Sequence, residues 1–179
     1  MRDLIEILTA MAAQKDKVKD RLELQLDMGD RVVKTLTHEF SCKGDEVAIL
    51  LLSSDGRHLR FIAPRRFSDL GSIPVTKRDS IAVGVLARRT GEVTNNVPMV
   101  RHVSFFESIK LRDKPVPIQK MVTAPLLVRG QAVGVAQISR KGETPREAGP
   151  DFTPADLRHA QEVLDSVALY LADARPAGY

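Results

Sequence analysis

The sequence contains one cysteine, no tryptophan and few other aromatic residues, and each scarcity excludes a class of protein. The lone Cys42 cannot form an intramolecular disulfide or a multi-cysteine metal site, and its isolation fits a reducing cytoplasm. Because aromatic residues make up only 4% of the chain, the core must be aliphatic. No apolar run approaches the roughly 18 residues of a membrane-spanning helix. The first residues include acids and no hydrophobic stretch, so we expect a cytoplasmic chain without a signal peptide.

The overall composition is that of an ordinary globular protein. Its 179 residues, 43% hydrophobic and 28% charged, suit one domain with an extra helix or two. Basic residues gather in the window 57–89, where two acidic residues, Asp69 and Asp79, give a net charge of +6 with the eight basic ones. The basic residues are Arg57, Arg60, Arg65, Arg66, Lys77, Arg78, Arg88 and Arg89. Such a patch can steer an anionic ligand, a nucleic acid or an acidic partner, but we favour solvated surface charge. No nucleic-acid-binding motif accompanies it, so nucleic acid is not an expected partner.

The first 22 residues predict an amphipathic helix with a narrow apolar stripe. The stripe consists of Leu4, Leu8, Met11, Val18 and Leu22, spaced alternately by four and three residues with one slot filled by Lys15. A stripe this narrow suits a dimerising, signal-transmitting helix. It equally suits a helix that lies along its own domain, and both alternatives stay open.

Gly29, between two aspartates, predicts a break in the helical pattern. We therefore divide the chain into an N-terminal signalling or dimerisation helix (1–29), a domain (30–175) and a flexible tail (176–179). After the break, Val32, Val33, Leu36 and Phe40 recur at helical spacing, and Gly44 is the expected C-cap. Close to that cap, Cys42 is expected to be a small hydrophobic residue rather than a reactive thiol.

Two segments predict β-hairpins. In the first, Val47–Leu52 and His58–Ala63 flank a turn with Asp55-Gly56. The second spans Val122–Ser139, with two apolar runs about Arg129-Gly130. Pro125 cannot donate to a ladder, so we place it at an edge-facing or bulged position. In the last strand, Ala132, Gly134, Ala136 and Ile138 should face the terminal helices, and their small size should admit a helix closely, while Val133, Val135 and Gln137 point the opposite way.

Shorter elements complete the order. We expect an extended piece at Ser72–Val75, followed by a helix over about Asp79–Arg89 that begins at Asp79 or Ser80 and stops at Gly91. A strand at Glu92–Val97 and a short helix within Val100–Leu111 should come next. A closing helix is introduced by Thr153-Pro154-Ala155-Asp156. Strands joined by hairpins imply an antiparallel sheet with helices on one or both faces, an α+β fold.

Four phrases in this order resemble the GAF domain family, over about Asp30 to Ala174. They are Val47–Leu52 with Asp55-Gly56, the helix and Thr90-Gly91-Glu92-Val93 within Ser80–Val97, the hairpin Thr123–Ile138, and Phe152–Leu157. The resemblance implies a six-stranded antiparallel sheet with the N- and C-terminal helices on one face. The other face would carry a small-molecule pocket roofed by short helices and loops. Such domains sense ligands and signal through flanking helices, often as dimers.

The specialised branches of the family fit poorly, so no cofactor is implied. Asn95-Asn96, Phe105 or Phe106, and Glu107 do not reproduce the signature of cyclic-nucleotide-binding members. Cys42 precedes the first strand, unlike the chromophore cysteine of bilin-binding members, and one cysteine is too few for the methionine-sulfoxide reductases. A haem would need an axial histidine, and a lone His102 is more often a surface residue.

Seven residues are predicted to line the pocket: Ser80, Asn96, Arg101, His102, Phe105, Phe106 and Thr123. The arginine and histidine would meet an anionic group, a phenylalanine would stack on a ring, and Asn96 and Thr123 would orient polar edges. We expect a non-catalytic sensory module that binds an unidentified small molecule, pairs through its terminal helices and acts on a separate effector protein. The alternative is an interaction module with a closed pocket. No catalytic motif indicates an enzyme.

Overall fold

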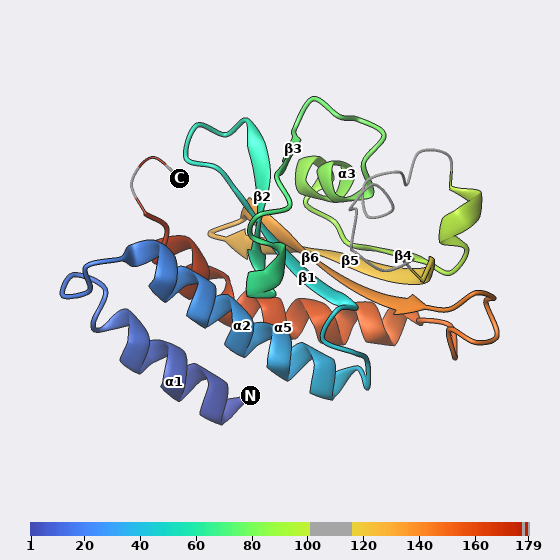
Figure 1. Cartoon of the computed structure of the whole chain (residues 1–179), viewed down its shortest axis with the longest axis horizontal. Coiled ribbons are helices and arrows are strands. Elements are labelled where there is room, and N and C mark those ends of the chain that lie inside the picture. The colour runs from blue at the N-terminus through green and yellow to red at the C-terminus, as the bar shows by residue number, and fades with distance from the viewer. Residues whose placement is uncertain (101–115, 177, 179) are drawn as a thin grey trace.

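The computed structural model describes residues 1–100, 116–176 and 178. Along these residues lie α1 (Arg2–Ala12), α2 (Arg21–Glu39), β1 (Val47–Leu52), β2 (His58–Ala63), η1 (Arg65–Phe67), β3 (Ser72–Pro74), α3 (Ile81–Arg88), β4 (Glu92–Thr94), η2 (Val97–Met99), β5 (Ile118–Val128), β6 (Gln131–Lys141) and α5 (Pro154–Asp173). The strands form one six-stranded sheet in the order β3-β2-β1-β6-β5-β4, with every neighbouring pair antiparallel. Helices α1, α2 and α5 form a layer on one side of it, and α3 lies on the other (Figure 1). The expected α+β architecture is confirmed.

The predicted helix over the first 22 residues is wrong, because it is divided into two. Helix α1 ends at Ala12, and α2 begins after Asp20, whose side chain accepts hydrogen bonds from the N–H groups of Leu22 (2.9 Å) and Glu23 (3.1 Å). The charged run between the helices contains only Val18 as an apolar residue, and an aspartate N-cap starts a new helix efficiently.

The predicted break at Gly29 is also wrong, since α2 continues through it. Gly29 is needed for packing: a Cβ there would lie 2.8 Å from the Ala63 Cβ and 3.2 Å from the Ile62 carbonyl oxygen of β2. The helix thus uses the missing side chain to approach the sheet, and the approach compensates for the low helix propensity of glycine.

Helix α1 lies along its own domain, which decides between the two alternatives left open for its stripe. Leu4 and Leu8 are buried in the same cluster as the apolar faces of α2 and α5. A hydrogen bond of 2.9 Å joins Thr9 Oγ1 to the Tyr170 hydroxyl of α5. The inner stripe of α1 is therefore occupied within the chain.

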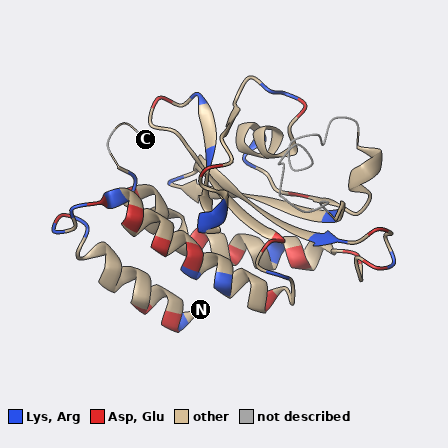
Figure 2. Ribbon diagram, in the orientation of Figure 1, with Lys and Arg blue, Asp and Glu red and all other residues tan. Residues whose placement is uncertain are grey.

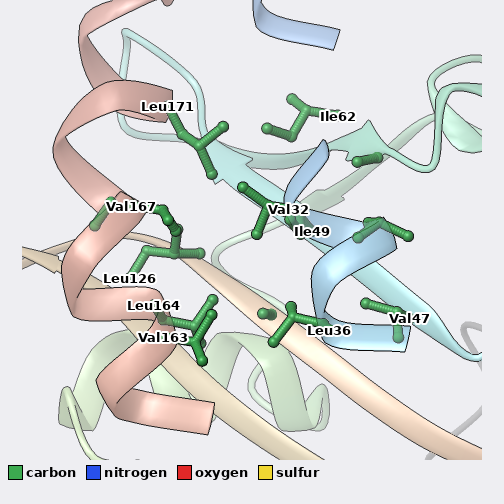
Figure 3. Packing of buried hydrophobic residues seen from close by; sticks show 14 of the residues in the cluster. Val32, Leu36, Val47, Ile49, Ile62, Leu126, Val163, Leu164, Val167 and Leu171 are labelled. Atoms are coloured by element: carbon green, nitrogen blue, oxygen red, sulfur yellow. The ribbon is translucent and has the colours of Figure 1, made fainter. Parts of the chain in front are cut away.

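The main core fills the space between the helices and the sheet (Figure 3). Leu36 of α2, Ile49 of β1 and Leu164 of α5 are fully buried in it. Helix α5 has the predicted cap: Thr153 Oγ1 accepts from the Asp156 N–H (3.2 Å), and the Asp156 carboxylate accepts from the Thr153 N–H (2.6 Å).

The hairpin β5–β6 closes through Arg129 and Gly130, both at positive φ, as expected of a tight turn. Pro125 pairs with Val135 of β6 but lies beyond the end of β4, which stops pairing at Thr123, so its edge-facing position is confirmed. The carbonyl of Pro125 accepts a hydrogen bond from Gln161 Nε2 of α5 (3.1 Å).

The two faces of β6 are confirmed at Ala136 and Ile138, which face the helices, and at Val135, which faces the other way. Val133 is a correction: the register shifts opposite Leu126 and Leu127, and Val133 turns to pack against the helix-side cluster. Gly134 makes room for a strand rather than a helix, since a Cβ there would lie 2.3 Å from the Leu50 carbonyl oxygen of β1.

Two predicted helix ends also shift by a few residues. Helix α2 ends at Glu39, with Phe40 as its C-cap and Ser41 next at φ 49°, instead of being capped at Gly44. Helix α3 begins after the predicted Ser80 cap but ends at Arg88, with Arg89 at φ 58° as its C-cap, instead of stopping at Gly91. In both places, a residue that adopts the left-handed conformation ends the helix before the glycine is reached.

Candidate functional site

Among the described residues, the face of the sheet away from the terminal helices carries two apolar clusters. The larger one joins Leu50 and Phe61 of the sheet to Val85 of α3. The smaller one consists of Val97, Ile118 and Met121. Ile81, the first residue of α3, packs against both.

A row of polar residues crosses this face. In the register of the sheet, Gln137 of β6 lies between Ala48 of β1 and Thr123 of β5, and Thr123 pairs in turn with Glu92 of β4. Thr123 and Gln137 are buried, with 1% and 5% of their surface exposed. Gln137 Nε2 donates to Thr123 Oγ1 at 3.4 Å, while Gln137 Oε1 has no hydrogen-bond partner among the described residues.

A narrow hollow adjoins this row, lined by Asp45, Glu46, Val47, Ala48, Ile118, Met121, Gln137 and Ser139. In this conformation it is too tight to admit a water-sized sphere, which is consistent with the absence of a partner for the Gln137 oxygen within the described structure. A ligand would enter only if side chains moved. Met121 is suited to such movement, because an unbranched thioether changes rotamer readily.

The charged groups at the rim of the hollow are already engaged. The Glu46 carboxylate accepts hydrogen bonds from the N–H groups of Lys43 (2.7 Å) and Lys141 (2.8 Å). Asp45 pairs with Lys141 Nζ at 2.9 Å. Burial works against ionisation of Asp45, but the hydrogen bond and charge of Lys141 outweigh it and hold the pKa of this carboxyl below its ordinary value.

Three of the seven predicted pocket residues lie within the described structure, and all three are on or beside this face. Thr123 is at the centre of the polar row. Ser80 caps α3, where its Oγ accepts from the Val83 N–H (3.4 Å), directly before Ile81. Asn96 is exposed and precedes η2, with no capping hydrogen bond from its side chain.

The other four predicted pocket residues, Arg101, His102, Phe105 and Phe106, lie outside the described residues. So does nearly all of the short helix expected within Val100–Leu111. The complete set of seven stays a prediction.

The side chain of Asn95 joins the end of β4 to the segment just before α5, and the sequence did not predict this contact. Its Nδ2 donates to the Phe152 carbonyl (2.8 Å), and its Oδ1 accepts from the Phe152 N–H (2.9 Å). The Arg140 guanidinium lies 4.7 Å from the centre of the Phe152 ring. Asn95-Asn96 lies at the end of the predicted strand Glu92–Val97, and no sequence signal identifies a partner 57 residues away.

Two arginines of the basic window form ion pairs within the chain. Arg65 bridges Glu23 and Asp27 of α2, and Arg88 pairs with Glu92. Figure 2 shows the acidic residues along α2 next to the basic residues of η1. A wider groove of about 420 Å³ lies there, between α2 and Pro64–Arg66, and is open to solvent. These pairs support the interpretation of the window as surface charge.

Cys42 shows no feature of a reactive thiol. It is partly buried, and burial together with the nearby Glu46 raises its pKa from 9.0 to about 11. The described parts of the chain bring together no group of three or more His, Cys, Asp or Glu side chains that could hold a metal ion. Within the same residues, no helix has both the length and the apolar content needed to cross a bilayer.

Comparison with known proteins gives a consistent result. A family model described as "GAF domain" matches residues 27–171. The GAF domains of phosphoenolpyruvate-protein phosphotransferases from Acinetobacter and Coxiella burnetii superpose with TM-scores of 0.64 and 0.66 at 15% and 11% identity. The first match covers 97% of this chain and 95% of that one, and the second 96% and 94%.

An enzyme is also among the similar structures. The type II free methionine-R-sulfoxide reductase of Thermoplasma acidophilum has a TM-score of 0.58 at 13% identity, over 85% of this chain and 94% of its own. No curated protein matches the sequence. At these identities the structural likeness concerns the fold alone.

Proposed function

Since the chain belongs to the GAF domain family, a family of sensory and regulatory modules, we propose that it binds a small molecule without catalysing a reaction. The ligand would bind on the face of the sheet away from α1, α2 and α5. The observation that carries this proposal is the hollow between the two apolar clusters, lined from β1, β5 and β6 and holding the buried Gln137. A hollow that combines apolar side chains such as Ile118 and Met121 with a few polar groups is typical of a small-molecule site.

The sheet provides the route by which binding would reach the helices. Side chains of β6 alternate between the two faces, so Gln137 borders the hollow while its neighbours Ala136 and Ile138 pack under the terminal helices. Opening the hollow would displace β5 and β6, and Asn95 would carry the movement to Phe152 at the start of α5. A separate effector protein would then read the position of the helices.

We also propose that two chains pair through this helical layer. Because the inner stripe of α1 is buried within the chain, the pairing surface would be the outer one. Ile7 of α1 and Leu169 of α5 are 37% and 60% exposed, on helices that lie together through Thr9 and Tyr170.

The absence of catalysis and a cytoplasmic location are part of the same proposal. The similar reductase leaves the fold compatible with catalysis, but this chain has a single cysteine, and its raised pKa disfavours the thiolate. A single cysteine is also in keeping with a reducing compartment.

A substitution that fills the hollow tests the binding proposal. Ala48→Leu adds side-chain atoms beside Gln137, whereas Ala87→Leu adds the same atoms at an exposed position of α3. Compounds that raise the Tm of the wild type should also stabilise Ala87→Leu but not Ala48→Leu, with folding of both verified by circular dichroism. If every stabilising compound acts equally on folded Ala48→Leu, the site is elsewhere. If no compound from a broad small-molecule library stabilises the wild type, the interaction module with a closed pocket is the better description.

A further inference from the structure

We propose that the ligand of this hollow is uncharged and donates a hydrogen bond, from a ring N–H or a hydroxyl, to Gln137 Oε1. The inference rests on the proposed function and specifies the chemical class of its ligand. Its basis is one oxygen that is buried, strongly hydrogen-bonding and without a partner in the described structure.

An amide oxygen removed from water without a partner lowers stability, so buried amides are nearly always hydrogen-bonded. Gln137 is 5% exposed, and the only hydrogen bond of its side chain within the described residues is the long 3.4 Å contact of its nitrogen with Thr123. A methionine would fill the same volume without this cost. The glutamine is therefore poorly explained by packing and well explained by a ligand that completes its hydrogen bonds.

A second buried glutamine offers a comparison. Gln25 of α2 also has an Oε1 without a partner among the described residues. It lies on the helix side of the sheet, and its Nε2 donates to the Leu171 carbonyl of α5 at 3.0 Å. Gln25 thus joins two helices, whereas Gln137 borders the hollow.

The charges around the hollow favour a neutral ligand. An anion would meet the carboxylates of Asp45 and Glu46, and would be repelled. A cation would find both carboxylates already satisfied, by Lys141 and by backbone N–H groups. Either ion would lose its hydration without gaining a free counter-charge from the described lining. A small apolar molecule with one hydrogen-bond donor loses the least hydration free energy when it enters the hollow.

Matched probes test the donor directly. Pyrrole and furan, and likewise indole and benzofuran, have nearly the same shape and differ by an N–H that is replaced by an oxygen. We expect wild-type protein to bind the N–H member of at least one pair about tenfold more tightly by calorimetry. In Gln137→Met this preference should disappear, and in the control Gln25→Met it should persist. Benzoate and benzylamine test whether the hollow binds an anion or a cation instead.

A measurement without ligand supports or opposes the same inference. Gln137→Met removes the unpaired oxygen at constant volume, so the ligand-free variant should have a Tm at least equal to that of the wild type. A lower Tm would show that the amide serves the fold and would overturn the inference.

Other outcomes separate this inference from the proposed function. If pyrrole and furan, or indole and benzofuran, bind equally and Ala48→Leu abolishes their binding, the donor is refuted while the binding face stands. Tighter binding of benzoate or benzylamine likewise refutes the neutral class alone. If none of these probes binds, the inference is overturned. The proposed function is then decided by the library screen alone, which compares the Tm shifts of the wild type and Ala48→Leu.

Discussion

Asn95 and Phe152 are 57 residues apart in sequence and exchange two hydrogen bonds, one in each direction between the asparagine amide and the phenylalanine backbone. The first residue follows β4 beside the candidate site, and the second lies immediately before the cap of α5. This pair therefore connects the binding face to a terminal helix without passing through the sheet.

Asn95→Ala should lower the free energy of unfolding by about 1–3 kcal/mol, because it leaves the partly buried N–H and C=O of Phe152 unpaired. Urea denaturation followed by circular dichroism measures the change. Asn96→Ala is the matched control: Asn96 is exposed and makes no capping hydrogen bond, so we expect a change within about 0.5 kcal/mol. Equal losses in the two variants would contradict the role assigned to Asn95.

Cys42 should react slowly with thiol reagents in the folded protein. With its pKa raised from 9.0 to about 11, the thiolate fraction at pH 8 falls about a hundredfold, before any steric protection. The neutral thiol is favoured by folding, so its contribution to stability is complete below about pH 9 and is lost as the pH rises through about 11. Reaction with a chromogenic disulfide from pH 7 to 10 measures the rate.

The control for that experiment is an exposed thiol in the same chain. Ser54→Cys in a Cys42→Ser background places the thiol in the exposed β1–β2 turn, where it should react at the rate of a free cysteine. Comparable rates for Cys42 and this control at pH 8 would show that the buried environment does not protect the thiol.

Leu169→Glu should convert a dimer into a folded monomer. The substitution places a charge on the outer surface of α5, where 60% of the leucine side chain is exposed, so the fold itself should lose little stability. Light scattering measures the mass, and circular dichroism the fold. Leu8→Glu is the contrasting variant, since it buries a charge in the core and should unfold the chain. A monomeric wild type, or an unchanged dimer in Leu169→Glu, would refute pairing through this surface.

The parts of the fold that were predictable depend on short-range signals. Asp55-Gly56 and Arg129-Gly130 define their hairpins because a tight turn needs residues that accept positive φ. Thr153 and Ser80 start their helices through hydrogen bonds that span only three residues. Strand alternation likewise placed Val135 and Ala136 on opposite faces, since the pattern requires no knowledge of distant elements.

Two of the errors occur where a distant contact overrides the local signal. Gly29 predicts a break locally, but its place against Ala63 makes it part of a continuous helix. A bulge turned Val133 to the helix side, although alternation alone predicted the opposite face. The continuous helix at Gly29 and the bulge at Val133 both depend on residues that are not close neighbours in the sequence.

From the sequence alone one could predict the antiparallel hairpins, the N-caps of α3 and α5, the aliphatic core and the face on which Gln137 lies, because each follows from backbone periodicity and local hydrogen bonds. Only the tertiary structure decided that α1 lies along its own domain, that Asn95 binds Phe152, and that the Gln137 oxygen is buried beside a hollow without a partner among the described residues. Those features arise where segments distant in sequence meet, and solvent exclusion there sets the energetic value of every polar group.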